Sequence, residues 1–289
     1  MNYVYSILRR NIYPFRYRFF KKELIYIYKY ILSSYISMNL CLGFFGFIRT
    51  LITPSEFNRF LELLPNNSTL DIFISCPNKI NELDSDTLVL NTDIFTEDMY
   101  DIFKNRNIYV NLYRYIPDIF REKSRNLKLP DFSNESRMFP YRIFSLHSSI
   151  SKLSKFILNH IDTNTIIYDN IILTRFDIFN SIQSFGTILD TTNTNNVYLW
   201  RNHSDTIYAE DKILITSIHG LKKLANLYES INSETVDTLC SEICSEVIIG
   251  KYMKSFDDII LKYQEGICIG LSPFIHVKYE ESFINQLRF

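Results

Sequence analysis

The sequence predicts an α/β fold with a mostly parallel central sheet flanked by helices. Short unbroken apolar runs recur along the chain, and such runs are typical of strands that are buried on both faces of a sheet. Segments with apolar residues at helical spacing separate these runs, and strands that alternate with helices form mostly parallel sheets. The chain has 289 residues, 46% hydrophobic and 22% charged, which is enough for one large domain with an ample core.

The first 37 residues are predicted to form a basic amphipathic arm, followed by one domain from residue 38 to 289. The arm carries seven Lys and Arg against Glu23 alone, a net charge of +6, so the remainder carries −7 of the total −1. In residues 21–37 the apolar side chains recur on one helical face. We expect the arm to pack on the acidic domain or to make peripheral contact with a membrane. An acidic domain argues against nucleic acid as a partner.

In the first half of the domain, turn residues separate the predicted elements. Gly43 and Gly46 mark the turn after the first strand, Thr53 or Ser55 can cap the first helix, and Pro77 ends the second strand. The expected strands are residues 38–44, 69–75, 84–91 and 108–113, and the expected helices are residues 53–64 and 96–105.

In the second half, a polar and basic stretch precedes a long helix. Residues 117–140 are predicted to be irregular because Pro117, Pro130 and Pro140 bracket them, and they are the best candidate for a mobile loop over a site. The elements expected after them are helices at 142–161, 218–230 and 236–252 and strands at 166–176, 197–200 and 207–215.

The strand at 166–176 carries the most informative residues. Three apolar residues, 171–173, run directly into Thr174, Arg175 and Asp177. Side chains alternate along a strand, so Arg175 and Asp177 point to the same side. The carboxyl end of a buried strand is where open α/β sheets bind their ligands. Spacing alone also allows a structural ion pair that closes the edge of the sheet.

Residues 168–177 resemble the I-x-x-R-x-D strand of capsule- and lipopolysaccharide-type glycosyltransferases, which occur in bacteria and large DNA viruses. Four other segments resemble pieces of that family in the right order: 39–49 its opening strand and Gly-x-x-R turn, 71–75 its D-V-F-I-H strand, 145–157 the helix before the R-x-D strand, and 209–217 its late D-D-x-x-x-G-S segment. The resemblance covers roughly residues 38–252. It implies a GT-A-like Rossmann-type fold, a nucleotide-sugar donor and a glycan or glycoprotein acceptor.

The resemblance also implies a donor site. Asp177 matches the carboxylate that holds Mn²⁺ or Mg²⁺ in GT-A enzymes, and Arg175 matches a charge partner or pyrophosphate contact. Arg175 stands where the usual Asp-x-Asp has its first Asp, so metal dependence stays open. Arg49, Asp71 and His219 match further donor contacts.

An acceptor hydroxyl needs a general base or a nucleophilic carboxylate, and the resemblance offers Asp211 and Glu246. Glu242, one helical turn before Glu246, is an alternative match. A second hypothesis is a catalytically inactive relative that serves as an assembly or membrane-surface module. The Arg in place of the first Asp and the altered first turn favour that hypothesis, whereas Arg175, Asp177 and Asp211 favour the enzyme.

Other function classes and locations receive less support. The chain lacks a P-loop, a Gly-x-Ser-x-Gly elbow and a Gly-x-Gly-x-x-Gly turn, so kinase, hydrolase and dehydrogenase functions are not predicted. The five cysteines are odd in number and form no secreted disulfide framework. No signal peptide is recognised. We therefore expect a cytoplasmic protein, in the host cytoplasm if the protein is viral, with membrane association only through the arm.

Overall fold

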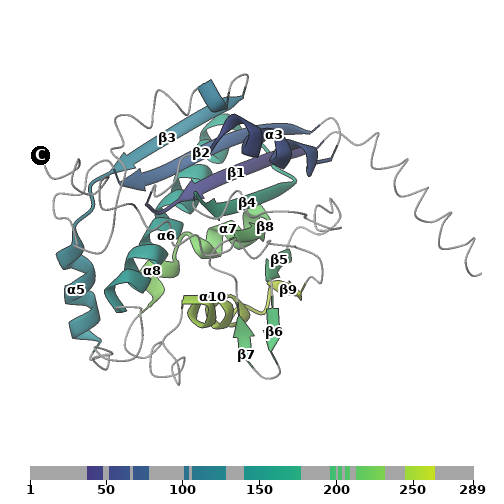
Figure 1. The fold of residues 1–289 in the computed structure, drawn as a ribbon. Helices are drawn as coiled ribbons and strands as arrows, with labels where there is room; N and C mark the ends of the chain where they lie inside the picture. Colours follow the sequence, from purple (N-terminus) through teal and green to yellow (C-terminus); the bar gives the residue numbers. More distant parts are fainter. Residues whose placement is uncertain are drawn as a thin grey trace, which may run out of the picture. The chain divides into compact units, whose positions relative to one another are not determined.

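Figure 1 shows the fold in a computed structural model. The structure describes residues 38–47, 52–65, 68–77, 101–103, 106–127, 140–176, 196–199, 201–203, 206–208, 213–231 and 245–263. The chain divides into two compact units, one of residues 39–64 and 70–289 and the other of residues 1–38 and 65–69. All helices and strands below belong to the first unit, except that β2 begins at Thr69 of the second.

A seven-stranded sheet forms the centre of the first unit, in the strand order β3-β2-β1-β4-β8-β5-β9. Its strands are β1 (Asn39–Phe45), β2 (Thr69–Pro77), β3 (Asn107–Tyr113), β4 (Asn170–Arg175), β5 (Asn196–Leu199), β8 (Ile213–Thr216) and β9 (Ile260–Tyr263). The pairs β1–β4, β2–β3 and β5–β9 are parallel, whereas β8 is antiparallel to β4 and β5. A mixed α/β fold with a mostly parallel sheet is therefore confirmed.

One face of the sheet is covered by α6 (Pro140–Asn164), which packs directly on Gly43 in β1. A Cβ added to Gly43 would lie 2.8 Å from Cδ2 of Leu153 and 3.2 Å from Cδ1 of Ile157. Only glycine allows the helix to approach the strand this closely. Around α6 lie α7 (Ile218–Leu224), α8 (Leu227–Ser230) and α10 (Ser245–Lys254), which share its apolar core (Figure 1).

The opposite face carries aromatic side chains and α3 (Pro54–Glu62). Neighbouring strand residues alternate, so Phe44 points away from the side of Gly43. Its ring stacks on Phe103 at 5.8 Å between centroids, and Phe57 of α3 meets Phe103 edge-on at 4.7 Å. Helix α3 starts as predicted, because Thr53 forms a capping box with Glu56. Helices therefore flank both faces of the sheet.

The prediction for residues 117–140 was wrong in its first part. These residues begin with α5 (Pro117–Asn126), and Pro117 occupies the first turn, where its missing N–H costs nothing. Asp118 lies in the first turn, and Lys123 and Arg125 lie in the last, as the helix dipole favours. Residues 128–139 of the predicted loop lie outside the described residues, and Pro140 begins α6. The predicted strand at 84–91 also lies outside them.

Two further predictions are corrected in the second half, and one strand was missed. The strand predicted at 207–215 is interrupted: β7 (Thr206–Tyr208) pairs with β6 (Arg201–His203) in a separate antiparallel sheet, and β8 joins the main one. The helix predicted at 218–230 breaks between α7 and α8 at Ala225 and Asn226. Strand β9 was not predicted.

Within the described residues, no helix combines the length and the apolar character that a membrane crossing requires. The predicted basic arm, residues 1–37, lies outside the described residues, so its contact with a membrane stays a prediction.

Candidate functional site

The strand order reverses between β1 and β4, and this reversal defines the candidate site. From β1 the chain moves outward to β2 and β3, and it then returns to place β4 on the other side of β1. In an open α/β sheet, the crevice outside the carboxyl ends of the strands on either side of such a reversal is the usual ligand site. The residues that end β1 and β4 are therefore the candidates.

Strand β1 ends at a glycine turn. Gly46 directly follows the strand with φ of 87°, a conformation that favours glycine. A Cβ built on Gly46 would meet no atom within 4 Å, although the residue itself is buried. The next residue, Phe47, packs edge-on against Tyr115 at 4.8 Å between ring centroids. Strand β1 therefore ends in a buried glycine turn that has free space beside its Cα.

Arg175 ends β4 beside this turn. Its Cα is the register partner of Phe45, the last residue of β1. Side-chain alternation places Arg175 on the same face as Leu173, whereas Phe176 stacks on Phe44 at 4.7 Å on the other face. The side chain of Arg175 is partly exposed. A cation therefore lies at the carboxyl edge of β4, next to the glycine turn that ends β1.

Three of the predicted site residues, Arg49, Asp177 and Asp211, lie outside the described residues. Asp177 follows Phe176 directly in the sequence, and Asp211 precedes Ile213 by two positions. Ile213 begins β8 and is the register partner of Thr174 near the end of β4. The amino end of β8 therefore lies at the same edge of the sheet as Arg175.

Asp71 lies at the opposite end of the parallel strands, where they begin. It is near the amino end of β2, its Oδ1 accepts a hydrogen bond from Nδ2 of Asn107 at 2.8 Å, and its Oδ2 accepts one from the Tyr168 hydroxyl at 2.6 Å. Burial, and then this hydrogen bond to Asp71, raise the pKa of Tyr168. Tyr168 itself precedes β4. The structure therefore does not bring Asp71 to Arg175.

His219 also lies away from Arg175. It is in the first turn of α7, which follows Thr216, and Thr216 pairs with Ile171 near the amino end of β4. His219 Nε2 lies 2.7 Å from Oδ2 of Asp258, and Lys223 Nζ lies 3.1 Å from the same oxygen. The hydrogen bond from Lys223 is the largest cause of a lowered pKa at Asp258; desolvation opposes it, and the hydrogen bond from His219 lowers the pKa further.

Glu246 is the second residue of α10, and only its backbone is described. The preceding residue, Ser245, is buried, and its Oγ lies 3.1 Å from Nε2 of His147 in α6. Burial lowers the pKa of His147 to about 3, so this imidazole is neutral at physiological pH. This pairing is one that sequence analysis missed.

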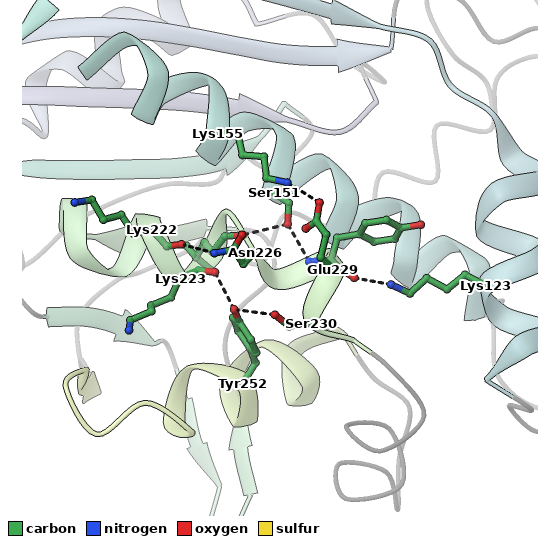
Figure 2. Close-up of polar contacts among 11 residues, drawn as sticks. Lys123, Ser151, Lys155, Lys222, Lys223, Asn226, Glu229, Ser230 and Tyr252 are labelled. Carbon is green, nitrogen blue, oxygen red and sulfur yellow. Dashed lines mark hydrogen bonds and ion pairs between the residues drawn. The ribbon is translucent and has the colours of Figure 1, made fainter. Parts of the chain in front are cut away.

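Figure 2 shows a second missed feature, a polar junction between α6 and the pair α7 and α8. The Ser151 hydroxyl donates to the Leu224 carbonyl at 3.1 Å and accepts from the Tyr228 amide at 3.0 Å. Lys123 of α5 donates to the Tyr228 carbonyl at 2.5 Å. Four further serines of α6 are buried as well: Ser145, Ser148, Ser149 and Ser154. The clue in the sequence is the frequency of serine on a helix that otherwise reads as apolar.

Across the described residues, no group of three or more His, Cys, Asp or Glu side chains is placed to hold a metal ion. The residue proposed for Mn²⁺ or Mg²⁺, Asp177, lies outside that part of the chain. The metal therefore stays a prediction.

No protein-family model matches the chain, and no curated protein matches it either. Among solved structures, it is similar to one named PaToxG Glycosyltransferase, with a TM-score of 0.32 and 9% sequence identity. That match covers 80% of this chain and 76% of the other. A likeness at this level adds no weight to a functional assignment, which depends on the strand order and on the residues at the carboxyl edge of β1 and β4.

Proposed function

We propose that the protein is a glycosyltransferase with a GT-A-like Rossmann-type fold, which moves a sugar from a nucleotide-sugar donor to a glycan or glycoprotein acceptor. The observation that supports this most is the reversal of strand order between β1 and β4. There the glycine turn at Gly46 and the cation of Arg175 lie at one edge of the sheet. A glycine turn beside a cation suits a ligand that carries a pyrophosphate.

In the proposed reaction, the bond between the anomeric carbon and the phosphate oxygen breaks, and its electron pair leaves with the nucleoside diphosphate. The acceptor hydroxyl forms the new bond to the anomeric carbon and loses its proton to a carboxylate. Arg175 stabilises the charge that develops on the leaving oxygens. Arg49, two positions beyond the described Phe47, is proposed as a second contact to the pyrophosphate.

Asp177 is proposed to bind the donor directly or through Mn²⁺ or Mg²⁺, which would supply Lewis-acid stabilisation of the leaving group. Asp211 is the preferred base, since it lies two residues before the strand end that meets the carboxyl edge of β4. Glu246 is the alternative base. We leave Asp71 and His219 out of the donor site because they lie at the opposite edge of the sheet.

A non-catalytic relative that serves as an assembly or membrane-surface module is the second candidate. It is favoured by Arg175 itself, which replaces a metal-binding carboxylate with a cation. The two candidate functions differ in whether a nucleotide sugar binds at the carboxyl ends of β1 and β4.

Thermal shift with UDP-, GDP- and CDP-sugars, each with and without Mn²⁺, tests the proposal. We expect one nucleotide class to raise the melting temperature, because a ligand that binds only the folded state stabilises it. A sugar-transfer or donor-hydrolysis assay with that donor then tests catalysis. If no donor stabilises the protein, the non-catalytic candidate is favoured; stabilisation without turnover would also favour it.

A further inference from the structure

We propose that two copies of this chain pair through β3, edge to edge and antiparallel, so that their sheets join into one. Strand β3 is the last strand on its side of the sheet, and among the described residues it pairs only with β2. Soluble proteins protect such edges with charged residues, proline or bulges. The seven residues of β3, Asn-Ile-Tyr-Val-Asn-Leu-Tyr, include neither a charged residue nor a proline.

The two faces of β3 differ in how well they are covered. Tyr109 stacks on Phe73 at 4.8 Å, and the Tyr113 hydroxyl lies 2.8 Å from Oγ of Ser149 in α6, so these side chains face α6. By alternation, Ile108, Val110 and Leu112 face the other way.

That second face is only partly covered. Ile108 and Val110 are half-buried, and Leu112 is 40% exposed. Two of the other exposed large hydrophobic residues, Ile116 and Ile119, follow closely at the start of α5. As far as the chain is described, this end of the sheet therefore combines an unpaired strand edge with incompletely buried apolar side chains.

The sequence of β3 points to a second copy as the partner. When β3 pairs antiparallel with itself about Val110, Val110 lies opposite its own copy and Ile108 lies opposite Leu112. On the other face, Tyr109 lies opposite Asn111. Apolar side chains thus meet apolar ones across the two-fold axis, and polar ones meet polar ones, which is the self-complementarity that an isologous interface needs.

The flanking charges give this register a second, testable property. Arg106 and Arg114 are exposed at the two ends of β3, and the register brings each Arg106 opposite Arg114 of the partner copy. Like charges across an interface repel, and salt screens the repulsion. Salt should therefore strengthen this dimer, whereas it would weaken a dimer held by opposite charges.

The test is sedimentation velocity of the full chain over a range of protein and salt concentrations. We expect a monomer–dimer equilibrium that shifts toward dimer as salt rises. Arg114→Glu should tighten the dimer roughly tenfold at low salt and reverse its salt dependence.

Val110→Lys and Val110→Glu should each lose the dimer, because like charges then meet on the two-fold axis. A mixture of the two variants should restore it. The matched control is Ile260→Lys in β9, at the other end of the sheet, where Ile260 is 46% exposed.

Circular dichroism confirms that each variant is folded. If Val110→Lys does not fold, Leu112→Lys replaces it, since Leu112 already contacts solvent and tolerates a charge better. A wild-type chain that stays monomeric at every accessible concentration would overturn the proposal. So would a dimer that survives the lysine in β3 or that is lost in Ile260→Lys, and so would a weaker dimer in Arg114→Glu.

Discussion

Gly43 and Leu153 lie so close that a Cβ placed on the glycine would be 2.8 Å from Cδ2 of the leucine. Cδ2 of Leu173 would be at 2.9 Å. Strand β1 and helix α6 therefore meet through the bare backbone of Gly43, and this contact sets how closely α6 covers the strands that end at the candidate site.

Gly43→Ala should consequently lower the free energy of unfolding by about 1–3 kcal/mol, the usual cost of overpacking a core. Urea denaturation measures the loss. The contacting atoms are the ends of flexible side chains, so truncating one of them should relieve the strain. In a double-mutant cycle with Leu153→Ala, the combined loss should be smaller than the sum of the single losses. Additive losses would show that the two groups do not clash.

The elements predicted best are those whose signal is local. Residues 171–173 form an unbroken apolar run, and each is fully buried in β4. Thr53 and Glu56 stand at the spacing of a capping box, and α3 begins there. Helix α5 was missed because proline and charged residues were read as signs of a loop, although proline suits the first turn of a helix.

The site was harder to predict because strand direction is not a local property. An apolar run such as 213–216 reads the same whether it lies parallel or antiparallel to β4. Because β8 is antiparallel, the helix after it begins near Ile171, and His219 lies away from Arg175. Likewise, Asp71 lies near the amino end of β2 whereas Arg175 ends β4, so the two residues lie at opposite ends of the parallel strands. Their separation depends on the tertiary arrangement of the strands.

The stability of the protein should fall at acidic pH because of His147. Burial lowers its pKa from 6.5 to about 3 in the folded state, while the unfolded chain keeps the ordinary value. The unfolded state therefore binds a proton that the folded state does not. The titration of this histidine therefore leaves the stability of the folded state relative to the unfolded state unaffected above pH 6.5. That stability decreases as the pH falls from 6.5 toward the folded-state pKa of about 3. Between pH 7.5 and 5 we expect a loss of about 2 kcal/mol in the free energy of unfolding.

Urea denaturation at the two pH values measures this loss, and His147→Gln is the variant that removes it. That variant should be less stable at pH 7.5 but should show a smaller difference between the two pH values than the wild type. Ser154→Ala is the control, because Ser154 is also buried in α6 but carries no group that titrates between these two pH values, so the pH dependence should remain. If His147→Gln retains the full pH dependence, another group is responsible.

Arg175→Gln should weaken donor binding while leaving the fold intact. The side chain is partly exposed at the end of β4, so its loss leaves no buried cavity. A charge-assisted contact to a pyrophosphate contributes about 1.5–3 kcal/mol, which corresponds to roughly 10- to 150-fold in Kd. Isothermal calorimetry with the donor identified by thermal shift measures the change. Arg125→Gln, an exposed arginine at the end of α5, should bind the donor as the wild type does. Equal affinity in the two variants would remove Arg175 from the site.

Asp177→Asn separates a catalytic role from a structural one. The substitution keeps the size of the side chain and removes its charge. If Asp177 binds the metal or the donor, the loss should be about 2–4 kcal/mol of transition-state stabilisation, or roughly 30- to 1000-fold in rate. If it only pairs with Arg175 near solvent, the variant should lose at most about 1 kcal/mol of stability and keep its transfer rate.

The matched control is Asp118→Asn, because Asp118 forms an exposed ion pair with Arg121 at 3.2 Å in α5. This control should show only the small loss of stability that such a pair contributes. Initial rates of transfer and melting temperatures of the two variants, measured side by side, therefore distinguish the roles. A folded Asp177→Asn enzyme with the wild-type rate would exclude Asp177 from catalysis. A rate loss confined to Asp177→Asn, with a melting temperature close to that of Asp118→Asn, would assign the charge at position 177 to the transfer reaction.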